Sequence, residues 1–191
     1  MLSLVQELDT KLFFAMNSLA GNSLFDQFNM FLSSRNVWVG ILLALVALTL
    51  WKGGALGKKL VLCSVIVVSF TDSFTYIVLK ENIQRLRPCK EYKDQVITPS
   101  GCKSQFGFPS NHAANSAAIA STIYFVGYKA VGGLFWGIAI LVGLSRIFLG
   151  VHYPMDVLFG LVSGGLYSFL IVKAVNMIID YRKKKAQDSG S

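Results

Sequence analysis

The stretch LVLCSVIVVSFTDSFTYIVL, residues 60–79, is long and apolar enough to decide the fold class. A helix needs about 20 mostly apolar residues to cross the hydrocarbon core of a bilayer. Further apolar runs of this kind lie at residues 37–51, 113–128, 134–151 and 154–179. The chain is 53% hydrophobic, too apolar for an ordinary soluble protein. The sequence therefore predicts an all-α integral membrane helical bundle with about five transmembrane helices, in a single domain over residues 1–191.

The N-terminal segment predicts a different kind of helix. Its apolar residues recur at helical spacing, at Leu4, Val5, Leu8, Leu12, Phe13 and Met16. This pattern is typical of an amphipathic helix that lies in the membrane interface. A sixth crossing by residues 1–20 fits poorly, because the charges of Glu7, Asp9 and Lys11 interrupt it. We therefore expect residues 1–35 to form an interfacial helix and connector. The segment lacks the residue order of a signal peptide, so we expect it to be retained.

The basic residues orient the predicted spans. One side of a five-span arrangement collects Lys52, Lys58, Lys59, Lys129 and residues 182–185. The positive-inside rule makes that side cytoplasmic, with a polar tail at residues 181–191. Residues 80–111 then form an extracytoplasmic loop, in a multi-pass protein of the inner (plasma) membrane whose site faces the periplasm or exterior. That loop is itself basic, against the rule. We interpret its cations as serving an anionic ligand, and an inverted orientation is the alternative.

The overall charge and the cysteines restrict the partners. The net charge is +8, from 18 Lys and Arg against 10 Asp and Glu. A basic chain suits nucleic acid or anionic lipid. Because no nucleic-acid-binding pattern is visible, the sequence favours a bilayer and a lipid substrate with no nucleic acid. Cys63 lies within an apolar run, whereas Cys89 and Cys102 flank the polar loop and form a disulfide only if it faces an oxidising compartment. Two histidines without a Cys-x-x-Cys pattern make a weak metal site, so no metal is predicted.

Three polar blocks interrupt the apolar background and contain both histidines. They are Lys80-x6-Arg87-Pro88, Pro109-Ser110-Asn111-His112 and Ser145-Arg146-x5-His152-x3-Asp156. Polar groups at membrane depth are costly, which favours a functional role. The predicted spans bring all three blocks to one membrane face. This convergence indicates one site built from residues far apart in the sequence.

The residue types in these blocks suit phosphoryl transfer. His152 and Asp156 are four residues apart and can share a helix face, where the carboxylate fixes one imidazole nitrogen and frees the other for attack. Lys80, Arg87 and Arg146 can bind phosphoryl oxygens. The structural alternatives are an interfacial histidine with a helix-capping Asp156, and snorkelling of Lys80 and Arg87. Arg146 fits the second alternative poorly, because it follows about a dozen mostly apolar residues.

The second block predicts the start of a helix. Ser110 is expected to cap it, and the free backbone N–H groups at such a start bind anions. His112 lies two residues further on, where it can protonate a leaving oxygen. As a helix cap alone, the motif is common and weak.

Together the blocks resemble the type 2 phosphatidic acid phosphatase superfamily, which also contains vanadium haloperoxidases and bacterial acid phosphatases. The family pattern is Lys-x6-Arg-Pro, Pro-Ser-Gly-His and Ser-Arg-x5-His-x3-Asp. This chain matches it at Lys80, Arg87, Pro88, Pro109, Ser110, His112, Ser145, Arg146, His152 and Asp156. One position departs from the pattern, because Asn111 replaces glycine. Its side chain either crowds the phosphate or supplies a further donor, and we expect activity to survive.

The resemblance implies a role for each matching residue. His152 would be the nucleophile that forms a phosphohistidine, Asp156 would orient it, and His112 would be the general acid. The phosphate would be held by Lys80, Arg87, Ser110, Asn111 and Arg146. Hydrolytic members of the family need no metal, and no cofactor is expected.

The activity implied is that of an integral membrane phosphatase acting on a lipid phosphate or pyrophosphate. Undecaprenyl pyrophosphate is the favoured substrate; phosphatidylglycerophosphate, phosphatidic acid and lipid A 1-phosphate are alternatives. Arg85, Lys90, Lys93 and Lys103 would favour a diphosphate or contact neighbouring anionic lipids. Phosphoryl transfer to another lipid shares the first half-reaction. A non-catalytic protein that binds anionic lipid is a weaker alternative, and haloperoxidase chemistry suits a membrane chain less well. No pattern indicates an oligomeric state.

Overall fold

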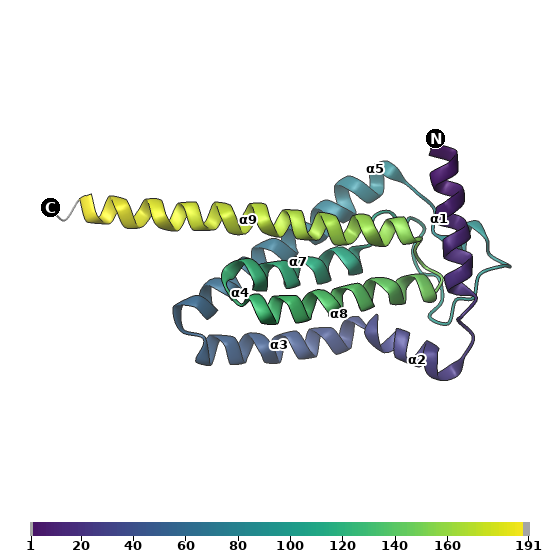
Figure 1. Ribbon diagram of the computed structural model, residues 1–191, viewed down its shortest axis with the longest axis horizontal. Helices are drawn as coiled ribbons and strands as arrows, with labels where there is room; N and C mark the ends of the chain where they lie inside the picture. The colour runs from purple at the N-terminus through teal and green to yellow at the C-terminus, as the bar shows by residue number, and fades with distance from the viewer. Residues whose placement is uncertain (1, 189–191) are drawn as a thin grey trace.

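Long helices run side by side in the computed structural model, and the N-terminal helix lies across one end of them (Figure 1). The structure describes residues 2–188. Its elements are α1 (Leu2–Asn17), α2 (Ser23–Leu32), α3 (Arg35–Lys52), α4 (Gly54–Ser73), the π-helix η1 (Phe74–Lys80), α5 (Glu81–Ile83), α6 (Pro88–Glu91), α7 (Asn111–Val126), α8 (Lys129–Phe148) and α9 (Pro154–Asp188). Residues 2–188 form no strand beyond one isolated bridge between Leu86 and Phe106.

Four segments are long and apolar enough to cross a membrane. They are Arg35–Lys52, Gly54–Ile83, Lys129–Phe148 and Pro154–Asp188. The fifth long helix, α7, has 16 residues and lies in the centre, packed against α4, α8 and α9. The predicted all-α membrane bundle is confirmed.

Two segments run further than the sequence predicts. The helical stretch that begins at Gly54 continues without a break to Ile83, and α9 continues to Asp188 rather than ending near residue 179. Residues 181–188, predicted to belong to a polar tail, are therefore helical. Lys, Arg and Ala are strong helix formers, so the polar end of α9 sustains a helix.

Small residues bring α7 and α9 into close contact. Ala113, Ala114, Ala117 and Ala118 on α7 are fully buried. A Cβ atom added at Gly160 of α9 would lie 2.7 Å from the Ser110 carbonyl oxygen, and one added at Gly164 would collide with the Ala114 carbonyl oxygen. This packing of small residues is typical of membrane helices. It fixes the start of α7 against the first turns of α9.

The π-helix η1 positions Lys80 at the end of the second span. Each residue of an α-helix advances by about 100°, so a π-bulge that inserts one residue rotates everything beyond it by that amount. Lys80 is the last residue of η1 and only 5% of it is exposed. It thus points into the bundle and does not snorkel to the membrane surface.

Helix α1 is anchored across the end of the bundle (Figure 1). Asn17 donates from Nδ2 to the carbonyl oxygens of Ile97 and Phe148, at 2.9 and 3.0 Å. Phe13 is fully buried and packs edge-to-face on Tyr153. Leu4, Leu8 and Leu12 remain exposed. An anchored polar side and a free apolar side are what an interfacial helix requires.

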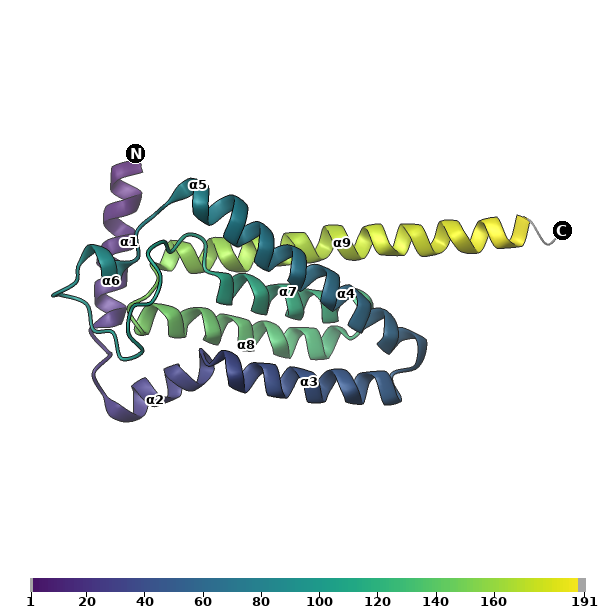
Figure 2. The ribbon, with the colours of Figure 1, turned by 180° about the vertical axis from the view of Figure 1, so that it is seen from behind.

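The long loop between α5 and α7 passes beside α1 before it returns to the bundle (Figure 2). Its two ends pair with each other: the Arg87 amide donates to the Gln105 carbonyl oxygen at 3.0 Å, and the Gly107 amide to the Arg85 carbonyl oxygen at 2.8 Å. Cys89 and Cys102 form a disulfide, with their Cα atoms 6.0 Å apart. The bridge joins two residues that lie between these paired ends in the sequence, so it closes the loop a second time, and Cys89 packs in the buried core.

We expect removal of this disulfide to lower thermal stability and to preserve the chemistry. Bridging residues 13 apart restricts the unfolded chain and contributes about 3 kcal/mol. The measurement is the melting temperature in detergent of the parent and of Cys89→Ser/Cys102→Ser. A reductant should lower the melting temperature of the parent and leave that of the double variant unchanged. A parent that melts identically with and without reductant would contradict this.

Candidate active site

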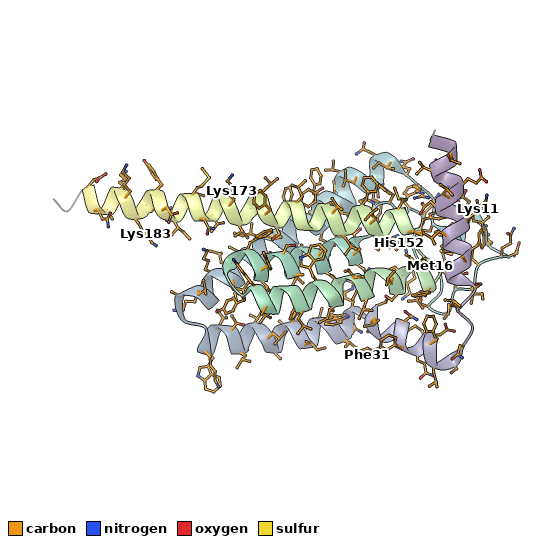
Figure 3. The ribbon with its side chains drawn as sticks, in the orientation of Figure 1. Lys11, Met16, Phe31, His152, Lys173 and Lys183 are labelled. Carbon is orange, nitrogen blue, oxygen red and sulfur yellow. A yellow bond between two sulfur atoms is a disulfide. The ribbon has the colours of Figure 1, made fainter. Side chains whose placement is uncertain are left out.

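The residues of the three polar blocks meet at the α1 end of the bundle. His152 lies in the turn before α9, beside α1, whereas Lys183 lies at the opposite end of α9 (Figure 3). Lys80 comes from the end of η1, Arg87 from the long loop, His112 from the first turn of α7 and Arg146 from the last turn of α8. The structure thus brings together residues from all three blocks, which lie far apart in the sequence.

His152 and Asp156 form a buried pair. They are 1% and 0% exposed, and His152 Nδ1 lies 3.3 Å from Asp156 Oδ2. The same carboxylate oxygen accepts a 3.0 Å hydrogen bond from the Tyr153 amide. Asp156 occupies the first turn of α9, where the helix dipole favours an anion. With Nδ1 directed at the carboxylate, Nε2 is the nitrogen available for attack.

Arg85 holds the other oxygen of Asp156. Its Nη1 donates to Asp156 Oδ1 at 2.8 Å and its Nη2 to Asp9 Oδ2 at 2.7 Å. The guanidinium lies 4.0 Å above the ring centroid of Tyr153. Asp9 Oδ1 in turn accepts from the Met155 amide at 2.9 Å. Arg85 is therefore an internal support for Asp156, and the idea that it is a surplus cation for a second phosphate or a neighbouring lipid is wrong.

Three cations lie close enough to His152 to influence its charge. Lys80, Arg87 and Arg146 all act electrostatically on this histidine. Arg87 is fixed by a 3.0 Å bond from Nε to the Phe106 carbonyl oxygen. Arg146 has a buried Nε with no hydrogen-bond partner among the described residues. Buried cations with unused donors form a site for an anion with several oxygens.

Burial lowers the pKa of His152 well below 6.5, and the positive charges of Arg87, Arg146 and Lys80 lower it further. We therefore expect His152 to remain neutral, the form that attacks, from neutral pH down to values well below 6.5. The chain has two histidines, so ¹⁵N-histidine NMR in micelles can follow both, with His152→Asn assigning the signal. An apo-protein midpoint for His152 at or above 6.5 would contradict the expectation.

The second block lies at the start of α7. Ser110 occupies the N-cap position, but its hydroxyl makes no capping hydrogen bond; the oxygen is fully buried and has no partner among the described residues. The predicted cap position is thus right and the predicted cap bond wrong, which leaves the hydroxyl free for a ligand. His112 lies within hydrogen-bonding range of the Ser33 backbone. The Asn111 side chain donates from Nδ2 to Asp72 Oδ1 of α4 at 3.1 Å, so its amide group points toward α4.

Gly107 packs against the His152–Asp156 pair. A Cβ atom there would lie 2.9 Å from Asp156 Oδ2, 3.3 Å from Arg87 Cγ and 3.6 Å from His152 Nδ1. Any side chain would push on the pair or on the Arg87 stem. The absence of a side chain at this position is therefore part of how the site is built.

Sequence reasoning missed Gly107, Arg85 and Asp9 as parts of the site. Asp9 was interpreted only as a charge that interrupts an apolar helix, yet it is 4% exposed. The available signal was an acidic residue one turn before Phe13, on the polar side of an amphipathic helix. That signal does not show which residue Asp9 binds, because its partner Arg85 lies 76 residues away.

Comparisons with known proteins identify the family. The PAP2 superfamily matches residues 60–180. The chain is 36% identical over 129 residues to phosphatidylglycerophosphatase B of Bacillus subtilis, covering 62% of this chain and 60% of that protein. It is 28% identical to a lipid A 4'-phosphatase of Bacteroides thetaiotaomicron, covering 89% and 78%. The match to the first of these relatives thus spans less than two thirds of its length.

A solved structure shares the fold. The crystal structure of a transmembrane PAP2-type phosphatidylglycerolphosphate phosphatase from Bacillus subtilis superposes with a TM-score of 0.70 at 29% identity, over 92% of this chain and 88% of that one. The structural similarity therefore extends beyond residues 60–180, which match the family, to 92% of the chain. The resemblance predicted from the polar blocks is confirmed, and the chain belongs to the PAP2 superfamily.

Proposed function

We propose that this chain is a metal-independent membrane lipid phosphatase that works through a phosphohistidine on His152. The observation that carries the proposal is the His152–Asp156 pair, buried beneath three cations. A neutral imidazole with one nitrogen fixed is a nucleophile. Positioned cations supply the charge stabilisation that a loose phosphoryl transition state needs.

In the first half-reaction, Nε2 of His152 attacks the phosphorus atom as the bond to the leaving oxygen breaks. His112 donates a proton to that oxygen, so the lipid leaves as an alcohol or as a phosphate. Lys80, Arg87 and Arg146 bind the phosphoryl oxygens, helped by the Ser110 hydroxyl and the backbone N–H groups at Asn111 and His112. Asp156 stabilises the positive charge that develops on the imidazole.

In the second half-reaction, His112 is left deprotonated and removes a proton from water. The resulting hydroxide attacks the phosphohistidine, the N–P bond breaks, and inorganic phosphate is released with His152 neutral again. The proton taken from water restores the acid form of His112. An acceptor lipid in place of water would convert the same intermediate into a phosphotransfer product.

The site faces the extracytoplasmic side in this proposal. The end of α9 that carries residues 182–185 is the cytoplasmic end by the positive-inside rule, and His152 lies at the opposite end (Figure 3). A Cys89–Cys102 disulfide beside the site supports that side, because disulfides persist in oxidising compartments. The protein would then lie in the inner (plasma) membrane.

The test is phosphate release by the purified parent in detergent with excess EDTA. The substrates are undecaprenyl pyrophosphate, phosphatidylglycerophosphate, phosphatidic acid and lipid A 1-phosphate, a panel that includes the lipid after which phosphatidylglycerophosphatase B is named. Release that EDTA does not reduce supports the proposal. No release from any of these lipids would overturn it, and labelled phosphate in an acceptor lipid would assign the chain to phosphotransfer.

A further inference from the structure

A polar cluster lies in the seam between α4 and α7, directly beside the phosphate site. We call Asp72, Asn111 and Asn115 the seam cluster. Asp72 Oδ1 accepts hydrogen bonds from Nδ2 of Asn111 and of Asn115, at 3.1 and 2.8 Å. Asp72 is exposed and lies within the membrane-spanning segment Gly54–Ile83. A carboxylate exposed within a span is costly and points to a role.

The seam cluster presents unused hydrogen-bond acceptors. The Oδ1 atoms of Asn111 and Asn115 are buried and have no hydrogen-bond partner among the described residues. Thr71 and Thr75, in the same helical stretch as Asp72, are fully buried, and their hydroxyl oxygens are unpartnered too. Buried acceptors without donors cost free energy, which a ligand that brings donors would recover.

The position of the cluster determines which part of a ligand it meets. Asn111 lies between Ser110 and His112, the residues proposed to hold the phosphoryl group and protonate its leaving oxygen. Asn115 is one helical turn further along α7, about 6 Å deeper in the bundle. A lipid whose phosphoryl group is held by Ser110 and His112 would bring the atoms next to that group within reach of the cluster.

An apolar cavity of about 770 Å³ lies between α3, α4, α7 and α8. Ser69 and Val65 line it on the same face of α4 as Asp72, and Ile119 and Ile123 line it one and two turns beyond Asn115. Phosphate site, polar cluster and apolar cavity thus follow in the order in which a lipid presents phosphate, polar linker and hydrocarbon chain.

We propose that the seam cluster selects lipid phosphates that carry a hydroxyl or amide N–H donor next to the phosphorylated carbon, and this rests on the proposed function. A glycerol phosphate head group or an amino-sugar phosphate has such a donor. A polyprenyl pyrophosphate has none, and phosphatidic acid offers only ester oxygens there. Asn111, where the family pattern has glycine, is one of the residues that would make this selection.

The experiment compares kcat/KM for two lipids with identical acyl chains, phosphatidylglycerophosphate and phosphatidic acid, in mixed micelles with EDTA. We expect the parent to prefer phosphatidylglycerophosphate by about tenfold or more, since one such hydrogen bond contributes about that factor. Asn115→Leu and the isosteric Asp72→Asn should each lower this ratio several-fold, mainly by raising KM for phosphatidylglycerophosphate. Thermal melting checks that both variants fold.

Asn176→Leu is the matched control. Asn176 also lies in a membrane helix with a buried, unpartnered amide oxygen. It is 16 residues beyond Gly160, about 24 Å down α9 from the site. Its ratio should equal that of the parent. The inference about the seam cluster is wrong if the variants at Asn115 and Asp72 keep the parent ratio of kcat/KM. It is also wrong if the parent prefers undecaprenyl pyrophosphate to phosphatidylglycerophosphate. Either result would leave the proposed phosphatase function intact. A parent that releases phosphate from no lipid would overturn the proposed function together with it.

Discussion

His152→Ala is expected to lower kcat for lipid phosphate release by about 10⁴-fold or more, because the group that bonds to phosphorus is removed. The cations would still bind the substrate, so KM should change far less than kcat. The measurement is phosphate release from the best lipid of the panel, with parent and variant purified in parallel. Loss of kcat with KM nearly kept would assign His152 to the chemical step.

His112→Ala makes this prediction sharper, because the two histidines have different roles: His152 forms the bond to phosphorus, whereas His112 only transfers protons. With lipid labelled in the transferred phosphate and rapid quenching at alkaline pH, the parent and His112→Ala should carry label on protein. The label should persist longer in His112→Ala, which lacks the group that activates water. His152→Ala should carry none. Phosphate release or protein labelling that persists in His152→Ala would mean that the nucleophile is another residue.

Much of the site could be predicted from sequence because its parts are local motifs. His152 and Asp156 are four residues apart, a spacing that brings two side chains to one helix face wherever that helix lies. The predicted spans then carry Lys80, His112 and Arg146 to the same end without any knowledge of packing. The convergence of these residues in the structure follows from alternation of spans and from the positions of the blocks near the span ends.

The remaining features depend on contacts that spacing does not encode. The π-helix over Phe74–Lys80, which ends at the buried Lys80, has no signal in the sequence, because its residues are ordinary for a membrane helix. Gly107 is one of 17 glycines in the chain, and only the three-dimensional structure shows that it faces Asp156. Asn111 was expected to act on the phosphate through its side chain, but a carboxylate 39 residues away redirects that side chain.

Asp9→Ala is the second large effect that we expect, with a drop in kcat of about 10- to 100-fold. Asp9 accepts from Arg85 and from the Met155 amide, and so connects α1 to the residues that hold Asp156. Without it, Arg85 keeps only one carboxylate partner, and the start of α9 loses an acceptor. Displacement of a catalytic group by about 1 Å can cost on the order of 10²-fold in rate. The loss of the charged hydrogen bond to Arg85 should also lower the free energy of unfolding by about 2 kcal/mol.

Two further variants distinguish a role of Asp9 in positioning Arg85 and Asp156 from a general stabilising effect of α1. Glu7→Ala removes the same charge from the same helix, but Glu7 forms only an exposed pair with Lys11, so kcat and melting temperature should match the parent. Asp9→Asn keeps an oxygen for the Met155 amide and loses the charge that binds Arg85, so its kcat should lie between those of Asp9→Ala and the parent. Asp9→Ala could have a lower melting temperature and yet keep the parent kcat under conditions where it is folded. That result would mean that α1 only stabilises the bundle. A fall in kcat in folded Asp9→Ala would instead mean that the interfacial helix, through Arg85, sets the orientation of the nucleophile.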